Sequence, residues 1–194
     1  MELLLDMNRR YTFADYLTWW DDKRRELFDG FVHLMSPAPA LSHANVVGNV
    51  YTDLKNYIRN RKGACKVFTA PFDVRLPRNG EKEDDKIYTV VQPDICLVCN
   101  PEKLDERGCI GAPDMIVEVL SPATLKYDMN DKYRIYEAAG VKEYWAIAPK
   151  DKSVIVFLLQ KNGEYAEGIM YNEKSNIPVQ SLPGLEIEAN ELFQ

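Results

Sequence analysis

Two short apolar runs near the middle of the chain constrain its fold more than any other feature. They extend from Val90 to Cys99 and from Met115 to Leu120, and both are rich in β-branched residues. Runs of this length and composition are typical of strands that a sheet buries on both faces. We therefore predict a central β-sheet that is covered by helices.

Three segments have the pattern of helices that could cover such a sheet. A short amphipathic segment from Thr12 to Trp20 has Thr12 as a plausible N-cap and Asp15 in the role of a capping-box acid. Apolar residues recur at helical spacing from Leu41 to Arg61. A third helix is predicted after Ser121-Pro122, ending near Ala139 with Gly140 as its stop.

Turn signals and further apolar runs complete the expected sheet. Asp29-Gly30 and Asn162-Gly163 each lie between two runs and predict hairpins. Additional strands are predicted at Cys65 to Phe68, Phe72 to Leu76, Lys142 to Ala148 and Val154 to Leu159. The order of the elements predicts the α/β (α+β) class, with a mixed β-sheet flanked by helices. A chain of 194 residues without repeats or a linker fits one domain.

The charge of the chain limits how it could bind nucleic acid. Lys and Arg number 24 against 30 Asp and Glu, so the net charge is −6. Because nucleic-acid-binding domains usually carry a basic footprint, this chain must gather positive charge locally, recruit metal ions or depend on a partner. Two basic clusters exist, Lys23 to Arg25 and Arg59 to Lys62, and each is more commonly a solvated face than a DNA contact.

Hydropathy argues against a membrane partner. No apolar run approaches the roughly 20 residues of a membrane helix. The run Leu3 to Leu5 is too short for a signal-peptide core and has no basic region before it. We therefore expect a cytoplasmic protein.

The four cysteines predict neither a disulfide framework nor a zinc site. Cys96 and Cys99 have CxxC spacing, but residues three apart in a strand point to opposite faces and could not bind one metal ion. No second pair lies nearby. We expect buried apolar cysteines.

Two acidic residues interrupt the apolar runs. Asp94 follows Pro93, and Glu118 shares a strand face with Ile116 and Leu120. A buried carboxylate is costly unless it is paired or binds a metal ion. Each acid could serve as a cap or a salt-bridge partner, but two of them on separate strands indicate a shared cation. Carboxylate oxygens suit Mg²⁺ or Mn²⁺.

The third predicted helix adds a lysine to these acids. Its inward stripe, at steps of four and three, consists of Leu125, Met129, Lys132, Tyr136 and Ala139. If the stripe faces the sheet, Lys132 points toward Glu118 and could polarise a water or steady a phosphate oxygen. The alternative is that Lys132 extends out to solvent while its stem packs. Asp128, one turn earlier, could line the same cleft or only cap the helix.

These residues carry a resemblance to known nucleases. Pro93-Asp94 followed by a strand-borne Glu118 resembles the PD-(D/E)XK nuclease superfamily, which includes many restriction endonucleases. More closely, the chain resembles the bacterial Uma-two family of restriction-endonuclease-like proteins. The matching segments, between about Tyr11 and Phe193, are Arg25 to Gly30, Ser42-His43, Gln92 to Asp94, Val117 to Pro122, Asp128 with Lys132 and Tyr136, Gly140 to Trp145, and Pro183 to Leu185.

The resemblance implies one restriction-endonuclease-like domain over residues 11–193 with an αβββαβ core. It implies an endonuclease that acts on DNA with Mg²⁺ (or Mn²⁺). Asp94 and Glu118 would ligate the ion, with the Val119 carbonyl as a further ligand, and Glu26 would complete the site. The superfamily's lysine normally lies where this chain has Leu120, so Lys132 would take its catalytic role from the following helix.

The two histidines differ in what supports them. His43 lies on the helix face of Val47 and Val50, where spacing alone favours a packed or capping histidine. The resemblance at Ser42-His43 implies instead a residue that lines the cleft. His33, in the first hairpin, has no such support.

Three functional hypotheses follow. The leading one is a metal-dependent endonuclease that hydrolyses phosphodiester bonds in DNA. The second is a binding or scaffold protein that keeps the fold without turnover, motivated by the acidic charge and by Phe31, where the family usually carries a glutamate. The third is an enzyme acting on RNA or a small phosphorylated substrate. A homodimer is a further hypothesis, with Tyr16, Trp19 and Trp20 as a candidate exposed apolar patch.

Overall fold

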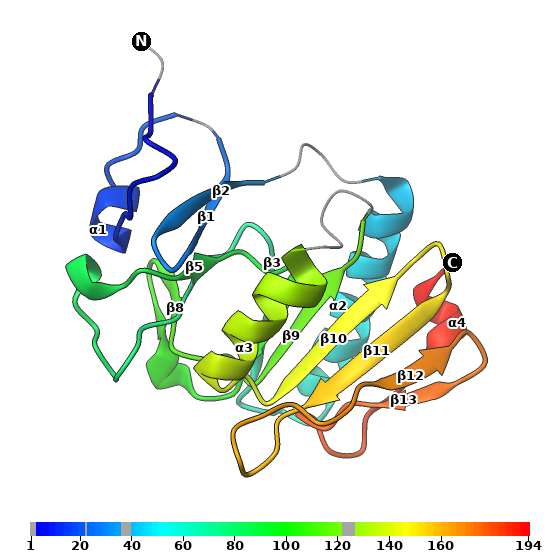
Figure 1. The fold of residues 1–194 in the computed structure, drawn as a ribbon. Coiled ribbons are helices and arrows are strands. Elements are labelled where there is room, and N and C mark those ends of the chain that lie inside the picture. The colour runs from blue at the N-terminus through cyan, green and yellow to red at the C-terminus, as the bar shows by residue number, and fades with distance from the viewer. Residues whose placement is uncertain (1–2, 22, 36–39, 122–126) are drawn as a thin grey trace.

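A six-stranded mixed sheet forms the centre of the molecule in the computed structural model, which describes residues 3–21, 23–35, 40–121 and 127–194 (Figure 1). We call it the central sheet. In spatial order its strands are β12 (Ile169–Asn172), β11 (Ser153–Leu158), β10 (Glu143–Ala148), β9 (Met115–Val119), β6 (Ile95–Val98) and β3 (Lys66–Thr69). Only the β9–β10 pair within it is parallel.

A second six-stranded sheet contains the first hairpin, and we call it the hairpin sheet. In spatial order its strands are β2 (Phe31–Leu34), β1 (Arg25–Phe28), β5 (Val90–Val91), β4 (Val74–Arg75), β8 (Gly108–Ile110) and β7 (Leu104–Asp105). The predicted turn at Asp29-Gly30 is confirmed, since both residues have positive φ and join β1 to β2. A two-stranded sheet of β13 (Asn176–Pro178) and β14 (Glu186–Glu188) completes the β structure of the described segments.

The helices confirm the predicted class, a mixed α+β fold with helices on the sheet. They are α1 (Phe13–Tyr16), α2 (Leu41–Asn60), α3 (Tyr133–Ala139) and α4 (Ala189–Leu192), with 3₁₀ turns η1 (Asp84–Lys86) and η2 (Pro101–Lys103) and a π-helix η3 (Tyr127–Lys132). Helix α1 begins with the predicted capping box of Thr12 and Asp15. Helix α3 ends at Gly140, whose φ of 87° gives the expected left-handed cap.

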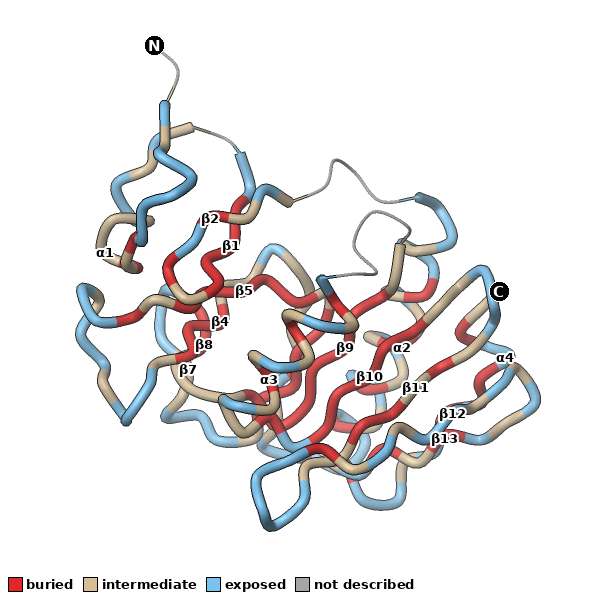
Figure 2. The backbone as a smooth tube through the Cα atoms, viewed as in Figure 1, coloured by how far each residue is buried: buried red, intermediate tan, exposed pale blue. Residues whose placement is uncertain are grey.

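Helices α2 and α3 cover opposite faces of the central sheet (Figure 1). On one face, Val50 and Leu54 of α2 pack in a core with Val117 of β9. On the other, Tyr136 of α3 packs in a core with Ile116 of β9. Strands β9 and β10 are accordingly buried almost throughout (Figure 2). The alternation of β9 therefore sends Glu118 toward α3, as predicted.

The run Val90 to Cys99 is not one strand, contrary to our prediction. It divides into β5 in the hairpin sheet and β6 in the central sheet. Pro93 has no N–H to give to a ladder, so the chain leaves one sheet and enters the other at Pro93-Asp94. Asp94 consequently lies at the junction of the two sheets.

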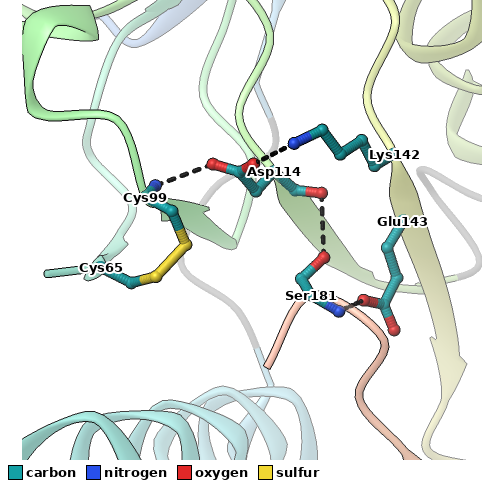
Figure 3. The surroundings of a disulfide bond; sticks show 6 residues. All are labelled: Cys65, Cys99, Asp114, Lys142, Glu143 and Ser181. Atoms are coloured by element: carbon teal, nitrogen blue, oxygen red, sulfur yellow. Dashed lines mark hydrogen bonds and ion pairs between the residues drawn. A yellow bond between two sulfur atoms is a disulfide. The ribbon is translucent and has the colours of Figure 1, made fainter. Parts of the chain in front are cut away.

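The expectation that all cysteines are buried thiols is wrong for two of them. Cys65 and Cys99 form a disulfide with an S–S distance of 2.03 Å (Figure 3). The antiparallel register, in which Lys66 of β3 faces Val98 of β6, places the two cysteines opposite each other. Cys96 and Cys109 are buried free thiols, as predicted, and burial raises the pKa of Cys109 to about 12.

The proposed apolar patch is also wrong as a whole. Tyr16 and Trp19 pack against the core around Phe13, and only Trp20 is strongly exposed, at 59%. The guanidinium carbon of the buried Arg25 lies 5.4 Å from the centroid of the Trp19 ring. This contact holds the Trp19 ring on the protein. The homodimer stays a prediction without this patch. Over the described ranges, no helix is long and apolar enough to cross a membrane.

Helix α2 offers a test of this packing. Leu54 is fully buried, so Leu54→Ala should lower the free energy of unfolding by about 2–5 kcal/mol in a urea titration. Leu41 begins the same helix and is 78% exposed. Leu41→Ala should therefore change the stability by only about 0.5 kcal/mol. Equal losses in the two variants would contradict the assigned core.

Candidate functional site

Three elements distant in sequence meet around one lysine. Glu26 extends from β1, Glu118 from β9, and Asp128 and Lys132 from η3. We call these four residues the acid–lysine cluster. All four are buried. Of the predicted site residues, the structure thus brings together Glu26, Glu118, Asp128 and Lys132.

Lys132 is the centre of the cluster. Its Nζ lies 2.9 Å from Glu118 Oε1, 3.1 Å from Glu26 Oε1 and 3.7 Å from Asp128 Oδ1. The predicted inward direction of Lys132 is confirmed, and the alternative of a side chain extended into solvent is wrong. Met129, Tyr136 and Ala139 of the same stripe also pack against the sheet, whereas Leu125 lies outside the described residues.

Local sequence explains how these groups are held. Glu118 pairs across β9 and β10 with Ala146, whose small side chain leaves room beside the carboxylate. The segment predicted as the start of an α-helix is a π-helix, a form often found at functional sites. The Tyr136 hydroxyl donates to Glu118 Oε1 at 2.5 Å, and the Tyr144 hydroxyl donates to the Asp128 carbonyl at 3.0 Å.

The cluster holds more acid than base. Burial raises the pKa of Glu118 well above its usual value, and the neighbouring carboxylates of Asp128, Asp94 and Glu26 add to this against the opposing effect of Lys132. Burial alone would lower the pKa of Lys132, but the surrounding carboxylates raise it, so the ammonium keeps its proton. Three carboxylates facing one ammonium favour the uptake of a further positive charge, either a proton or a cation.

Asp94 forms a second group at the end of β9. Its Oδ2 accepts a hydrogen bond from the Val119 amide at 2.8 Å and lies 3.1 Å from His43 Nε2. The carboxylate is 22% exposed, more than any acid of the cluster. The hydrogen bond between His43 and Asp94 raises the pKa of His43, whereas burial of the imidazole would lower it. His43 therefore lies beside a predicted site residue, and its role in lining the cleft stays a prediction.

The two groups do not form a ready metal site as they stand. Among the residues that the structure describes, no three His, Cys, Asp or Glu side chains make a group that could hold a metal ion. The ammonium of Lys132 lies within 3.1 Å of an oxygen of Glu26 and of an oxygen of Glu118. The metal-ligand roles of Asp94, Glu118 and Glu26 stay predictions, as does that of the Val119 carbonyl.

Comparisons with known proteins agree with this architecture. Residues 13–190 match the model of the Uma2 family, described as "Putative restriction endonuclease". The chain belongs to this family. An uncharacterized protein of Synechocystis sp. is 26% identical over 152 residues, which cover 77% of this chain and 74% of that protein.

A solved structure shares the fold of this Uma2 member. It is a crystal structure from Anabaena variabilis, described as a "putative nuclease belonging to DUF820". The match has a TM-score of 0.74 at 18% identity and covers 94% of this chain and 97% of that one. The match shows a shared fold, and the family supports a nuclease.

Two neighbours of the Uma2 site were missed as functional residues. The backbone N–H of Gln92 donates to Glu26 Oε1 at 2.8 Å. The side-chain Nε2 of Gln92 donates to Asp73 at 2.8 Å, and its Oε1 accepts from Arg24. The signal that could have indicated Gln92 is its place directly before Pro93-Asp94, in a segment that matches the family. His33 faces Glu26 across the hairpin, a pairing that follows from counting outward from the Asp29-Gly30 turn.

The basic cluster Lys23 to Arg25 is not a free DNA-binding surface. Arg25 is buried and paired with Asp21, and Arg24 donates to Gln92 at 2.8 Å. Both guanidinium groups thus serve contacts within the fold. The second basic cluster, residues 59–62, is exposed at the C-terminal end of α2, whereas His43 lies at the N-terminal end of that helix.

Replacing Lys132 with methionine tests the charge balance of the cluster. Three buried carboxylates would lose their shared ammonium, so we expect Lys132→Met to lose about 3–5 kcal/mol of stability at neutral pH. A carboxyl with a raised folded-state pKa, such as Glu118, contributes stability below its unfolded pKa of about 4.3 and loses it as pH rises. The deficit should therefore shrink as the pH falls toward that value.

Urea unfolding of Lys132→Met at several pH values measures this. Lys142 provides a matched control, since its Nζ lies 2.7 Å from Asp114 but its side chain is 70% exposed (Figure 3). Lys142→Met should cost no more than about 1 kcal/mol. A Lys132→Met deficit that does not vary with pH would show that the carboxylates are not its cause.

Proposed function

We propose that this Uma2 protein is a metal-dependent endonuclease that hydrolyses phosphodiester bonds in DNA, with Mg²⁺ or Mn²⁺ as its cofactor. The observation that carries the proposal is the buried excess of carboxylates around Lys132, beside the more exposed Asp94. The family supports a nuclease. The metal and the DNA substrate are inferred from the chemistry of the site.

The ligand chemistry of these residues suits a divalent cation, although in the structure the ammonium of Lys132 contacts the carboxylates of Glu26 and Glu118. Carboxylate oxygens are the ligands that Mg²⁺ and Mn²⁺ prefer, and Mg²⁺ in such sites usually keeps several waters. The three carboxylates around the single ammonium of Lys132 leave an excess of negative charge, so an added positive charge would be favourable there. Asp94 and Glu118, with Glu26, would hold the ion.

Each side chain then has a defined task. A bound ion would lower the pKa of its water and stabilise charge on the phosphate oxygens. Lys132 keeps its proton, so it acts as a donor that orients a water or a phosphate oxygen, and not as a base. Tyr136 fixes the Glu118 carboxylate, and Gln92 fixes that of Glu26, through the hydrogen bonds described above. His43 and the Val119 amide orient Asp94.

A second function is favoured by one observation. Lys132 already partners the carboxylates of Glu26 and Glu118, so the cluster could stabilise the fold without any metal ion. The protein would then be a catalytically inactive binding or scaffold member of the family. Binding of a metal ion separates the two functions, because only the first requires it.

Cleavage assays test the leading proposal. Purified protein with Mg²⁺ or Mn²⁺ should cut DNA, and Asp94→Asn or Glu118→Gln should lower the rate on the order of 100-fold or more. Asp151→Asn and Glu186→Gln make the same chemical changes at exposed positions and should leave the rate unchanged. Undiminished cleavage by Glu118→Gln would overturn the assignment. An RNA substrate in parallel tests the third hypothesis.

Thermal unfolding with Mn²⁺ gives a readout that is independent of turnover. A Mn²⁺ concentration about 100 times the Kd should stabilise the wild type by about 2.7 kcal/mol. Asp94→Asn should lose most of this stabilisation, because it removes an ionised ligand, while Asp151→Asn should retain it. A wild type whose melting temperature does not respond to Mn²⁺ or Mg²⁺ would favour the scaffold function.

A further inference from the structure

A cavity of about 380 Å³ opens beside the acid–lysine cluster. We propose that it binds one unpaired nucleotide of the nucleic acid, with the base against an aromatic wall and a phosphate on Arg78 and Arg134. The inference rests on the proposed function, since it names the form of nucleic acid that the site takes. The aromatic wall is formed by Phe28, Phe31 and His33.

The cavity and the cluster share their walls. Side chains alternate along β1, so Phe28 lies on the same sheet face as Glu26, and their partners on β2 are Phe31 and His33. A second wall comes from η3 and α3, where Asp131 directly precedes Lys132 and Arg134 lies two residues after it. The ion pair of Lys132 with Glu26, at 3.1 Å, therefore joins the two walls. A nucleotide in the cavity would be next to the cluster.

Phe31 is the exposed ring of the aromatic wall, because Phe28 is buried and stacks on His33. The rings of Phe28 and His33 are stacked with centroids 4.1 Å apart, and Tyr127 meets His33 edge-on at 5.5 Å. Phe31, next to them, is 41% exposed. Successive bases of single strands stack on such side chains largely regardless of sequence. The wall therefore fits a nucleobase.

The charge at the rim fits a phosphate. Arg134 is exposed and, within the described part of the chain, forms no ion pair. Arg78 is 73% exposed and contacts Asp29 at 3.3 Å, but Asp29 is also held by Arg10 at 2.6 Å. Asp29 is thus already neutralised by Arg10, which leaves the charge of Arg78 for a ligand. Asp131 is a further acceptor that a base N–H could meet.

The size of the cavity favours an unpaired nucleotide over a duplex. Its volume is at the small end of the roughly 300–1,000 Å³ of small-molecule sites. In a duplex both faces of each base are covered by neighbours, so a base reaches a platform only from a single strand, an end or a flipped position. We therefore expect single strands, or junctions that contain them, to bind more tightly than a continuous duplex.

Fluorescence anisotropy in EDTA at low salt tests this without turnover. The probes are a labelled single-stranded deoxyoligonucleotide of about 12 nucleotides, the duplex of the same sequence, and the corresponding ribo-oligonucleotide, which distinguishes DNA from RNA as the source of the nucleotide. The wild type should bind a single strand more tightly than the duplex. Phe31→Ala should weaken that binding by about 5- to 100-fold through lost stacking.

Arg134→Ala should weaken single-strand binding. It should also make the slope of the logarithm of the association constant against the logarithm of the salt concentration less steep by about 0.7, because one phosphate contact is lost. The controls are Leu34→Ala, an exposed apolar residue on the same strand as Phe31, and Arg59→Ala, an exposed arginine of α2. Both should bind within about twofold of the wild type. Phe31→Trp keeps an aromatic face and should restore binding.

Several results would overturn the proposal: a wild type that binds only the duplex or neither probe, variants Phe31→Ala and Arg134→Ala that bind like the controls, or a Phe31→Trp variant as weak as Phe31→Ala. The two proposals fail separately. If the protein does not cleave nucleic acid with Mg²⁺ or Mn²⁺ but binds the probes in EDTA as expected, the nuclease proposal fails and the nucleotide site stands. With cleavage but unaltered binding by Phe31→Ala and Arg134→Ala, the nucleotide site fails and the nuclease proposal stands.

Discussion

The interaction on which the rest of this structure depends is the set of ion pairs made by Lys132. Its ammonium lies within 4 Å of carboxylates from β1, β9 and η3. These elements belong to different sheets and to the helical layer, so one buried charge connects the hairpin sheet, the central sheet and α3. Such a cluster is costly to bury and strongly destabilising to break, which makes the relative position of the three elements sensitive to one side chain. The same position places Lys132 beside every acid that the family resemblance singled out, except Asp94.

Local sequence predicted those parts of the fold that local physics determines. The Asp29-Gly30 turn, the capping box at Thr12 and the stop at Gly140 each depend on a few neighbouring residues. The division of Val90 to Cys99 between two sheets was missed, because apolar periodicity does not report which partner strand each half will find. The Cys65–Cys99 disulfide was missed for the same reason, since it depends on the register of β3 against β6.

The residues of the candidate site also divide into those that local sequence could place and those that depend on long-range contacts. Strand alternation placed Glu118 on the face of Ile116, and helical spacing pointed Lys132 toward it, without any knowledge of tertiary structure. Glu26 came only from the family resemblance, because nothing near it in sequence shows that β1 will approach β9. The contact of His43 with Asp94 likewise joins the first turn of α2 to the junction of two sheets, a long-range pairing that spacing does not encode. What the side chains do chemically is a separate matter from where they lie.

The acidic character of the chain and the proposed chemistry can be reconciled by where the charges lie. A chain of net charge −6 repels nucleic acid at long range, and the cluster adds buried negative charge close to the place where a phosphate would react. An added divalent cation would reverse that local balance, so metal and substrate should favour each other's binding. Exposed cations are needed at the same edge, and Arg78 and Arg134 lie there, while Arg24 and Arg25 are engaged in internal contacts. On the proposed function, the protein thus attracts nucleic acid through a small local set of charges, and the metal ion lets the reacting phosphate approach the acid–lysine cluster.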